Sequence, residues 1–359
     1  MNSRHRSVSG TIFVVMLGGL ALTTAAQAQA SRASSAASYL ERGNQWLAKG
    51  ELDRAIADYD IAITFDARAA IVWYNRGIAR QRKGDLTGAL RDYDRAIELD
   101  PRHAEAYQNR GAVLYSRGEL DAAISDFSRA IEINPRDTNA WLNRGSARGD
   151  RGDWAAALAD LDQAIKLDRR SVAAWSNRCT LRYRQGAWDA AIADCNQALR
   201  LNGNDANAWN NRGLAREAKG DLTGALSDVD RAIALGPQEA SFYNNRAGIW
   251  LAKGEPERAL NDANHALALN PNLAEALANR GVARFAGGAF TRAIADFDEA
   301  LKLKPRFTDA YCSRGVAWLQ LGKIAEAEAD FTRCRALGAT PMPEAEKLLK
   351  SMKARPTPR

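Results

Sequence analysis

Residues 104–137 read AEAYQNRGAVLYSRGELDAAISDFSRAIEINPRD, and this pattern recurs along most of the 359-residue chain. The tripeptide Asn-Arg-Gly at residues 109–111 returns at residues 75–77, 143–145, 211–213 and 279–281. Related tripeptides fill the other steps, every step has the same length, and no insertion interrupts the series. The regular period predicts an array of similar units, whereas the length alone would suggest two or three ordinary domains.

The period divides residues 36–341 into nine units that share columns of residue type. We call the position of the tripeptide glycine the reference position; it is held by Gly43, Gly77, Gly111, Gly145, Cys179, Gly213, Ala247, Gly281 and Gly315. A second glycine follows it by seven residues in every unit, and an alanine follows it by twelve. The units comprise residues 36–69, 70–103, 104–137, 138–171, 172–205, 206–239, 240–273, 274–307 and 308–341.

Each unit is predicted to form two helices joined by a turn. The first helix ends at a glycine such as Gly50, because glycine tolerates the left-handed backbone of a helix C-terminus. The second helix carries apolar residues at spacings of three and four, as at Ile56, Tyr59 and Ile63, and a proline such as Pro101 follows several of these helices. One helix hairpin cannot bury its apolar faces alone, so neighbouring units must stack into a solenoid.

The pattern resembles the tetratricopeptide repeat (TPR), whose period is also about 34 residues, and the resemblance covers residues 36–341. An aromatic residue, a small residue, two alanines and a proline keep one register through the units. The resemblance, to a TPR protein of an exported bacterial type, implies an all-α fold: a right-handed α-solenoid of helix-turn-helix repeats whose first helices line a concave face. Residues 342–359 are expected to form a capping helix and a basic tail, because Leu348, Leu349 and Met352 would cover the last apolar face.

Residues 1–30 have the layout of a cleaved secretory signal peptide. Arg4 and Arg6 precede the apolar run TIFVVMLGGLAL, and we expect cleavage after Ala28 or Ala30. The protein is therefore expected to be periplasmic or secreted. The run has about 12 apolar residues, whereas a membrane span needs ~20, so no membrane span is expected in the mature chain. An uncleaved anchor is the alternative interpretation.

Composition and charge argue against disorder, catalysis and nucleic-acid binding. Apolar residues make up 46% of the chain and charged residues 26%, as in globular proteins. The net charge of +7 is concentrated in residues 1–30 and 342–359, so no basic stripe is expected and a nucleic-acid binder is kept only as an alternative. The three His residues occupy unrelated positions. We expect no enzymatic activity, no metal site and no cofactor.

The expected function is a non-catalytic protein–protein interaction scaffold that binds a partner protein or an extended peptide in its concave groove. Asn stands two residues before the reference position in seven units, and side-chain amides can both donate to and accept from a peptide backbone. The row resembles the asparagine ladder in the repeat domain of O-linked N-acetylglucosamine transferase. The candidate peptide-binding residues are Asn75, Asn109, Asn143, Asn177, Asn211, Asn245 and Asn279, together with Tyr74, Tyr115 and Tyr183.

Two alternatives stay open for this surface. The amides can instead bond their own helix or the neighbouring one, as buried amides usually do. The chain can also be a structural subunit of a cell-envelope or secretion assembly, held through a convex or terminal surface. The sequence predicts neither the identity of the partner nor the oligomeric state.

Two columns of opposite charge stand where the family usually has apolar residues. An Arg precedes the reference position in every unit, from Arg42 to Arg314, and an Asp follows each Arg at one fixed offset, from Asp58 to Asp330. We predict a repeated, partly buried salt bridge, formed within a unit or to its neighbour. Solvated charges on one face are the alternative.

The four Cys residues form two pairs, each confined to one unit. Cys179 and Cys195 centre on residue 187, and Cys312 and Cys334 centre on residue 323, next to the turn of each hairpin. Residues at equal distances from the turn of an antiparallel hairpin lie opposite one another, and an oxidising compartment permits disulfides. Both pairs are therefore candidate disulfides, with buried free thiols as the alternative.

Overall fold

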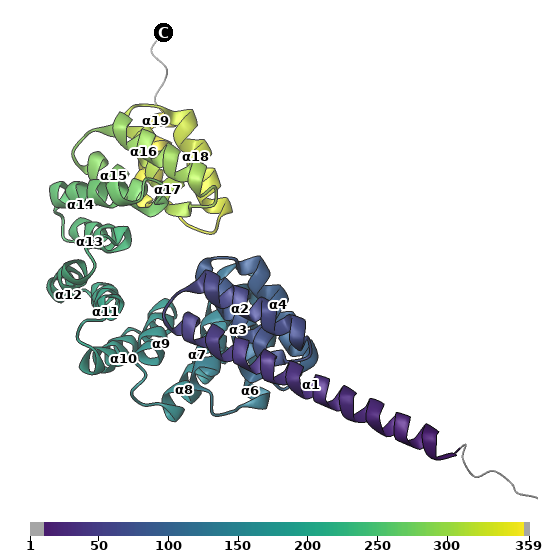
Figure 1. The fold of residues 1–359 in the computed structure, drawn as a ribbon. Helices are drawn as coiled ribbons and strands as arrows, with labels where there is room; N and C mark the ends of the chain where they lie inside the picture. The colour runs from purple at the N-terminus through teal and green to yellow at the C-terminus, as the bar shows by residue number, and fades with distance from the viewer. Residues whose placement is uncertain (1–10, 355–359) are drawn as a thin grey trace, which may run out of the picture. The chain divides into compact units, whose positions relative to one another are not determined.

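The structure is a computed structural model that describes residues 11–354, and all its regular elements in that range are α-helices (Figure 1). The helices of this range are α1 Thr11–Ala48, α2 Leu52–Phe65, α3 Ala70–Lys83, α4 Leu86–Leu99, α5 Ala104–Ser116, α6 Leu120–Ile133, α7 Thr138–Arg151, α8 Trp154–Leu167, α9 Val172–Arg184, α10 Trp188–Leu201, α11 Ala206–Ala218, α12 Leu222–Leu235, α13 Ala240–Ala252, α14 Pro256–Leu269, α15 Ala274–Ala286, α16 Phe290–Leu303, α17 Thr308–Gln320, α18 Ile324–Ala336 and α19 Pro343–Ala354.

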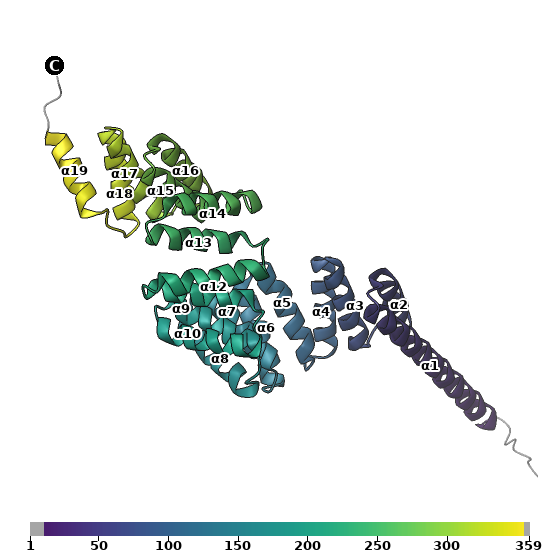
Figure 2. The same ribbon diagram turned by 90° about the vertical axis from the view of Figure 1, so that its left-hand side faces the viewer.

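The helices form two compact units, each larger than any of the nine sequence units, which are called repeats from here on. The first contains α1–α8 and ends at Arg169, and the second contains α9–α19 and begins at Arg170. In each unit an odd-numbered helix pairs with the even-numbered helix that follows it, and successive hairpins pack against each other (Figure 2). The prediction of an all-α solenoid built from stacked helix hairpins is confirmed.

The two helices of a hairpin approach each other most closely where glycine holds the reference position of the first helix. A Cβ atom on Gly281 of α15 would lie 2.7 Å from Cε1 of Phe297 on α16, and a Cβ atom on Gly315 of α17 would lie 2.5 Å from Cε1 of Phe331 on α18. Both rings are buried. Glycine at this position therefore lets the ring of the second helix lie directly against the backbone of the first.

Small residues allow the apolar core to continue from one hairpin into the next. In α6, Ala123, Phe127 and Ala130 are fully buried. Ala147 of α7, which belongs to the following hairpin, packs into the same cluster as Ala123 and Phe127. Because alanine has a short side chain, the helices on either side of this cluster approach closely and bury a continuous core.

The turn of each hairpin depends on the second glycine column. Gly118 has φ of +77°, a left-handed conformation that side chains disfavour. Its N–H donates to the carbonyl of Tyr115 at 2.9 Å, and the N–H of Glu119 donates to the carbonyl of Leu114 at 3.0 Å. These bonds satisfy carbonyl groups at the end of α5, as a helix-terminating motif does.

Helix α19 covers the last hairpin. Its residues Ala345 and Leu349 are buried in one cluster with Leu319 of α17 and Phe331 of α18. Figure 2 shows α19 as the last helix of the second unit. The predicted capping helix is thus present, while the end of the basic tail, residues 355–359, lies outside the described residues.

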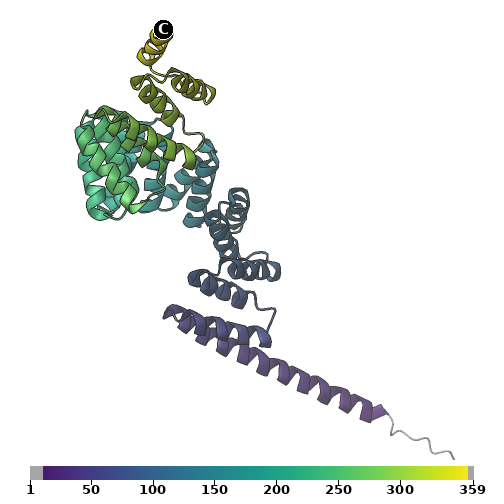
Figure 3. The same cartoon turned by 90° about the horizontal axis from the view of Figure 1, so that it is seen from above.

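Helix α1 begins inside the predicted signal peptide. It runs without interruption from Thr11 to Ala48, so residues 11–30 continue directly into the first helix of the first repeat (Figure 3). Arg4 and Arg6, the predicted basic start, lie outside the described residues. Between residues 11 and 354, no helix combines the length and the apolar character that a membrane crossing requires.

Candidate functional site

The candidate site is the surface that the first helices of the repeats form within each of the two units, which we call the first-helix face. On α3 it comprises Ile71, Tyr74, Asn75, Ile78 and Gln81, and the same positions recur once in every repeat on the other odd-numbered helices up to α17. Within the first unit, Ile78, Gln81 and Arg82 of α3 line a pocket together with Asn109 of α5. The first-helix face of this unit is therefore hollowed between neighbouring repeats.

Most of the candidate asparagines bind the preceding repeat. Their amide Nδ2 atoms donate along the first-helix face, each to a group on the first helix of the repeat before. The pairs are Asn75 to Asn44 Oδ1 at 2.8 Å, Asn109 to Tyr74 Oη at 3.2 Å, Asn211 to Thr180 Oγ1 at 2.7 Å, Asn245 to Asn210 Oδ1 at 2.9 Å and Asn279 to Asn244 Oδ1 at 2.9 Å. The amides thus link neighbouring repeats, as the local alternative expected, and their role in peptide binding stays a prediction.

Asn143 differs from these five residues. It is half-buried on α7, and its amide makes no hydrogen bond with another residue between 11 and 354. Asn177 occupies the equivalent position on α9. Asn143 is therefore the asparagine of this row whose amide is available to a ligand without breaking a hydrogen bond between repeats.

The three candidate tyrosines are half-buried on the first-helix face. The ring of Tyr74 lies 4.5 Å from the ring of His103, centroid to centroid, and its hydroxyl accepts the bond from Asn109. The hydroxyl of Tyr115 donates to Oδ2 of Asp150 at 2.5 Å. Burial raises the pKa of Tyr74 and of Tyr183, so both hydroxyls stay protonated and can donate hydrogen bonds.

The two charged columns meet in every repeat. In the fourth repeat, Nε and Nη2 of Arg144 donate to Oδ2 and Oδ1 of Asp160 at 2.9 and 2.8 Å. The same pair forms within each of the nine repeats, so the predicted salt bridge is confirmed and its location within one repeat is settled. All nine Asp residues of this column are buried.

The remaining guanidinium nitrogen binds the repeat before. Nη1 of Arg110 lies 2.7 Å from Oδ1 of Asp94 on α4, and Nη1 of Arg246 lies 2.7 Å from Oδ1 of Asp230 on α12. The guanidinium also lies over an aromatic ring three residues earlier, as for Arg246 over Tyr243 at 5.7 Å from the centroid. One Arg therefore joins both helices of its own hairpin to the second helix of the preceding hairpin.

A second arginine row binds the same carboxylates, and sequence reasoning did not pair it. Nη1 of Arg148 donates to Oδ2 of Asp160 at 2.7 Å. The row stands three residues after the reference position, and its members with such a bond are Arg80, Arg148, Arg182, Arg216 and Arg284. The sequence did contain a signal for this pairing. The arginines stand where the family often has Tyr, and the nearby Asp column also stands where the family has another residue type.

The pKa shifts agree with permanent charge on these groups. The hydrogen bond to Asp126 raises the pKa of Arg110, although burial opposes it. The hydrogen bond from Arg42 lowers the pKa of Asp58, again against the effect of burial. A general acid or base needs a pKa near the working pH, so these pairs suit structure rather than proton transfer.

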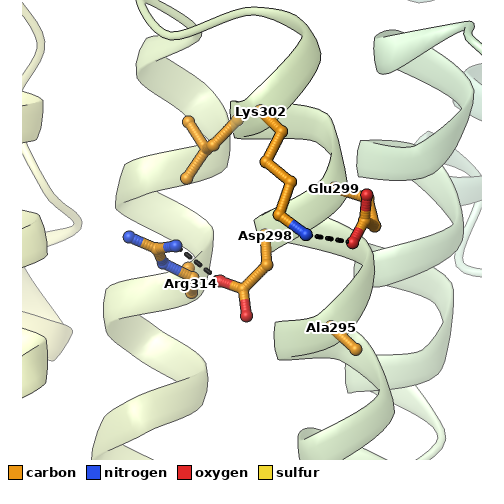
Figure 4. Close-up of a pocket in the computed structure, with 6 residues that line it drawn as sticks. Ala295, Asp298, Glu299, Lys302 and Arg314 are labelled. Atoms are coloured by element: carbon orange, nitrogen blue, oxygen red, sulfur yellow. Dashed lines mark hydrogen bonds and ion pairs between the residues drawn. The ribbon is translucent and has the colours of Figure 1, made fainter.

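In a pocket on the side of the second helices, the charged side chains are again paired with each other. Ala295, Asp298, Glu299 and Lys302 of α16 and Arg314 of α17 are among the residues that line it (Figure 4). Nη1 of Arg314 lies 2.5 Å from Oδ1 of Asp298, and Nζ of Lys302 lies 2.5 Å from Oε1 of Glu299. Each charged side chain of this pocket is paired with another, which leaves no unbalanced charge to attract a ligand.

The structure joins both cysteine pairs. Cys179 of α9 and Cys195 of α10 form a disulfide with Cα atoms 5.4 Å apart, and Cys312 of α17 and Cys334 of α18 form one with Cα atoms 5.5 Å apart. Cys179 holds the reference position, so its disulfide occupies the place where other hairpins pack a ring against glycine. Oxidation of the protein in its compartment stays a prediction, to be decided by thiol titration.

The histidines do not contribute to a metal site in the described part of the chain. Within residues 11–354, no three His, Cys, Asp or Glu side chains are arranged to hold a metal ion. The ring of His103 lies tilted against that of Tyr74, and the ring of His265 lies tilted against that of Tyr243 with ring centroids 4.1 Å apart. The two histidines thus serve in aromatic contacts of different repeats.

Several solved structures have a fold similar to that of this chain. A tetratricopeptide repeat protein from Parabacteroides merdae is 22% identical, with a TM-score of 0.58 over 70% of this chain and 99% of its own. The APC/C hetero-tetramer Cut9–Hcn1 matches with 17% identity and a TM-score of 0.64, over 88% of this chain and 76% of its own. Pseudomonas aeruginosa pilF matches with 19% identity and a TM-score of 0.52, over 58% of this chain and 94% of its own. At these identities the likeness concerns the fold alone.

The family comparison covers nearly all of the repeat array. The family described as Tetratricopeptide repeat matches residues 74–138, 142–206, 180–240, 210–274, 251–306 and 279–340, and the family described as TPR repeat matches residues 43–84. A comparison with curated proteins gives no match. TPR proteins bind proteins or peptides and are generally non-catalytic scaffolds. Because the family matches lie along residues 43–340, well over half of the chain, the chain belongs to the tetratricopeptide repeat family.

Proposed function

We propose that this chain is a non-catalytic scaffold that binds a partner protein or an extended peptide on its first-helix face. The observation that carries the proposal is the contrast between the two sides of the hairpins. The charged side chains that line the second-helix pocket of Figure 4 are paired with each other, whereas the pocket of the first-helix face is lined by Ile78, by the amides of Gln81 and Asn109, and by Arg82, whose guanidinium reaches the Leu47 carbonyl at 3.5 Å. On α3, Ile71 is 43% exposed, and a pocket lies beside Ile78. An extended peptide requires this combination of apolar contacts and backbone-directed hydrogen bonds.

Two isoleucines provide a matched test of the face. Ile71 lies on α3 in the first-helix face, and Ile61, which is 36% exposed, lies on the second helix α2. A partner captured from cell-envelope extract by the wild type should be lost with Ile71→Glu and retained with Ile61→Glu, because the introduced charge is equal and only the face differs. Loss with both variants, or with Ile61→Glu alone, would move the binding surface away from the first-helix face.

Asn143 tests the amide row separately. Because its amide has no partner among residues 11–354, Asn143→Ala should weaken binding of the captured partner without lowering the melting temperature. Asn245→Ala is the contrasting variant, since it also removes the bond to Asn210 and should lower stability. Unchanged binding by Asn143→Ala would leave the amides with a purely structural role.

We further propose that the protein acts in the periplasm or outside the cell. The layout of residues 1–30 supports export, and two cysteine pairs placed for disulfides suit an oxidising compartment. N-terminal sequencing of the protein recovered from the envelope fraction or the medium tests this. A start at Gln29 or Ser31 supports export, and a start at Met1 in a cytoplasmic fraction contradicts it.

A further inference from the structure

Gly248 leaves a notch in the first-helix face of the second unit. It lies inside α13, one residue after the reference position, where the neighbouring repeats carry Leu214 on α11 and Val282 on α15. A Cβ atom on Gly248 would have no neighbour closer than 4.0 Å, the distance at which it meets Oε1 of Glu217 and Nδ2 of Asn279. Gly248 does not have a positive φ, so no turn requires glycine here. The missing side chain opens space between the two neighbouring repeats.

Glu217 of α11 lines this notch with a half-buried carboxylate. Burial raises the pKa of Glu217, because it removes water from the charged form of the carboxylate. No Lys, Arg or His among residues 11–354 forms an ion pair with it, whereas Glu275 on α15 is paired with Lys304 at 2.9 Å. Tyr183 on α9 lies close enough for the charge of Glu217 to raise its pKa further, after the larger effect of burial. The face thus holds one half-buried negative charge without a counter-ion.

The amide nitrogen of Asn279, which lies at the notch, is already bound to the carbonyl oxygen and Oδ1 of Asn244. Asn245 and Asn279 donate their Nδ2–H groups to Asn210 and Asn244 of the preceding repeats. The Oδ1 atoms of Asn245 and Asn279 accept no hydrogen bond from the described residues, so their lone pairs are free for a ligand. A half-buried carboxylate without a counter-ion fits a cationic donor, which among side chains means the ammonium of Lys or the guanidinium of Arg.

We propose that the notch at Gly248 receives a Lys or Arg side chain from an extended segment of a partner protein, and that Glu217 pairs with its cationic head. The inference rests on the proposed function, because it names the partner chemistry of the first-helix face. Leu214 on α11 and Leu251 on α13 are half-buried residues of the neighbouring first helices, and we expect the alkyl stem of the entering side chain to pack against them. A charge-assisted hydrogen bond in a partly dehydrated site supplies the preference for a basic residue.

Short fluorescent peptides of Ala and Ser, which differ only at one central residue, test the proposal. The central residue is Lys, norleucine or Glu, and binding to the full chain is measured by fluorescence polarisation. Norleucine keeps the stem of Lys and removes its charge. The wild type should bind the Lys peptide roughly tenfold more tightly than the norleucine peptide, the ratio expected for one charge-assisted hydrogen bond.

Four variants locate the effect. Glu217→Gln and Gly248→Leu should lose the preference for Lys, and Glu217→Lys should prefer the Glu peptide. Gly248→Leu fills the notch and also raises helix propensity, so unfolding does not explain a loss of binding in that variant. Glu257→Gln removes an equal charge from the exposed surface of α14 and should keep the wild-type preference.

The outcomes separate this inference from the proposed function. Equal binding of the three peptides, or a preference for Lys that survives in both Glu217→Gln and Gly248→Leu, overturns the inference and leaves peptide binding on the first-helix face intact. Absence of binding for every peptide overturns both. A preference for Lys that disappears in those two variants and persists in Glu257→Gln supports both.

Discussion

Replacing Asp160 with Ala should destabilise the fourth repeat by about 3–5 kcal/mol, the range for a buried ion pair that loses one partner. The Asp160 side chain is 3% exposed. It accepts hydrogen bonds from Nε and Nη2 of Arg144 at 2.9 and 2.8 Å and from Nη1 of Arg148 at 2.7 Å. The substitution leaves two guanidinium groups beside an apolar site without the carboxylate that balances them.

The three hydrogen bonds do not simply add. Each is worth about 1.5–3 kcal/mol when charged groups take part. Arg148 is the more exposed of the two arginines and can turn towards water, and Arg144 keeps its hydrogen bond to Ser128 at 3.0 Å and its position over Trp141. The main cost is therefore the uncompensated charge of Arg144, whose side chain is 12% exposed.

The measurement has to be local, because repeats of a solenoid open in part as separate units. Urea unfolding followed by circular dichroism gives the total effect, and hydrogen exchange resolved to α7 and α8 gives the effect at the site. Glu98→Ala is the matched control: Glu98 pairs with Arg95 at 2.8 Å on the surface of α4 and is 63% exposed. It should cost no more than about 1 kcal/mol.

A rescue variant tests the cause. Arg144→Leu, Arg148→Tyr and Asp160→Phe together install the residue types that the family usually has at these positions, and a well-packed apolar replacement of a buried ion pair is often neutral. The triple variant should recover at least half of the lost stability. If Asp160→Ala changed stability by less than about 0.5 kcal/mol, or no more than Glu98→Ala, the carboxylate would behave as a surface charge and the reasoning would be refuted.

Three further predictions concern packing, pH and the cysteines. Gly281→Ala should destabilise by about 1–3 kcal/mol, because its Cβ would lie 2.7 Å from Phe297, whereas Gly248→Ala, with no atom nearer than 4.0 Å, should stabilise by up to about 1 kcal/mol; equal effects in urea unfolding would contradict the packing argument. The hydrogen bond from Arg42 lowers the pKa of Asp58, so the ion pair stabilises the fold above the ordinary carboxyl pKa of about 3.9, and this stabilisation is lost as pH falls through the lower pKa of the folded state. The difference in stability between wild type and Asp58→Asn should therefore disappear below about pH 4. A difference that does not depend on pH would count against the pairing. Thiol titration of the denatured, unreduced protein should find no free thiol, since both cysteine pairs are bridged, and four free thiols would remove both disulfides.

The sequence predicts those features that depend on fixed spacing. The Arg–Asp bridge could be anticipated because Arg144 and Asp160 keep one offset in every repeat and depart from the family together. The spacing in the sequence does not indicate which oxygen of Asp160 each nitrogen binds, or that Arg148 shares this carboxylate with Arg144. Both features depend on the angle between α7 and α8. The same holds for Nη1 of Arg110, whose partner Asp94 belongs to the preceding repeat.

Other features depend on neighbours that a single column does not show. Cys179 at the reference position looks like an exception in the sequence, yet its partner Cys195 stands where Phe127 and Phe297 pack against glycine in other hairpins. Ala247 and Ala263 make a second such exchange, in which two small residues replace glycine and a ring. Gly248 has no unusual neighbours along the chain, and its importance appears only when Glu217 and Asn279 are placed around it.

The shared arginine also bears on how such an array can change length. Arg110 binds Asp126 in its own hairpin and Asp94 in the hairpin before, and Arg246 makes the equivalent pair of bonds to Asp262 and Asp230. Arg144, Arg212 and Arg280 bind Ser128, Asn196 and Asn264 at the same spacing, so the position of the connector is repeated even where its partner differs. Deleting or duplicating a stretch of one full period restores every connector, whereas a stretch one residue shorter turns the arginine away from both carboxylates. A constant spacing between the arginine and its two partners thus favours a repeat period that does not vary along the chain.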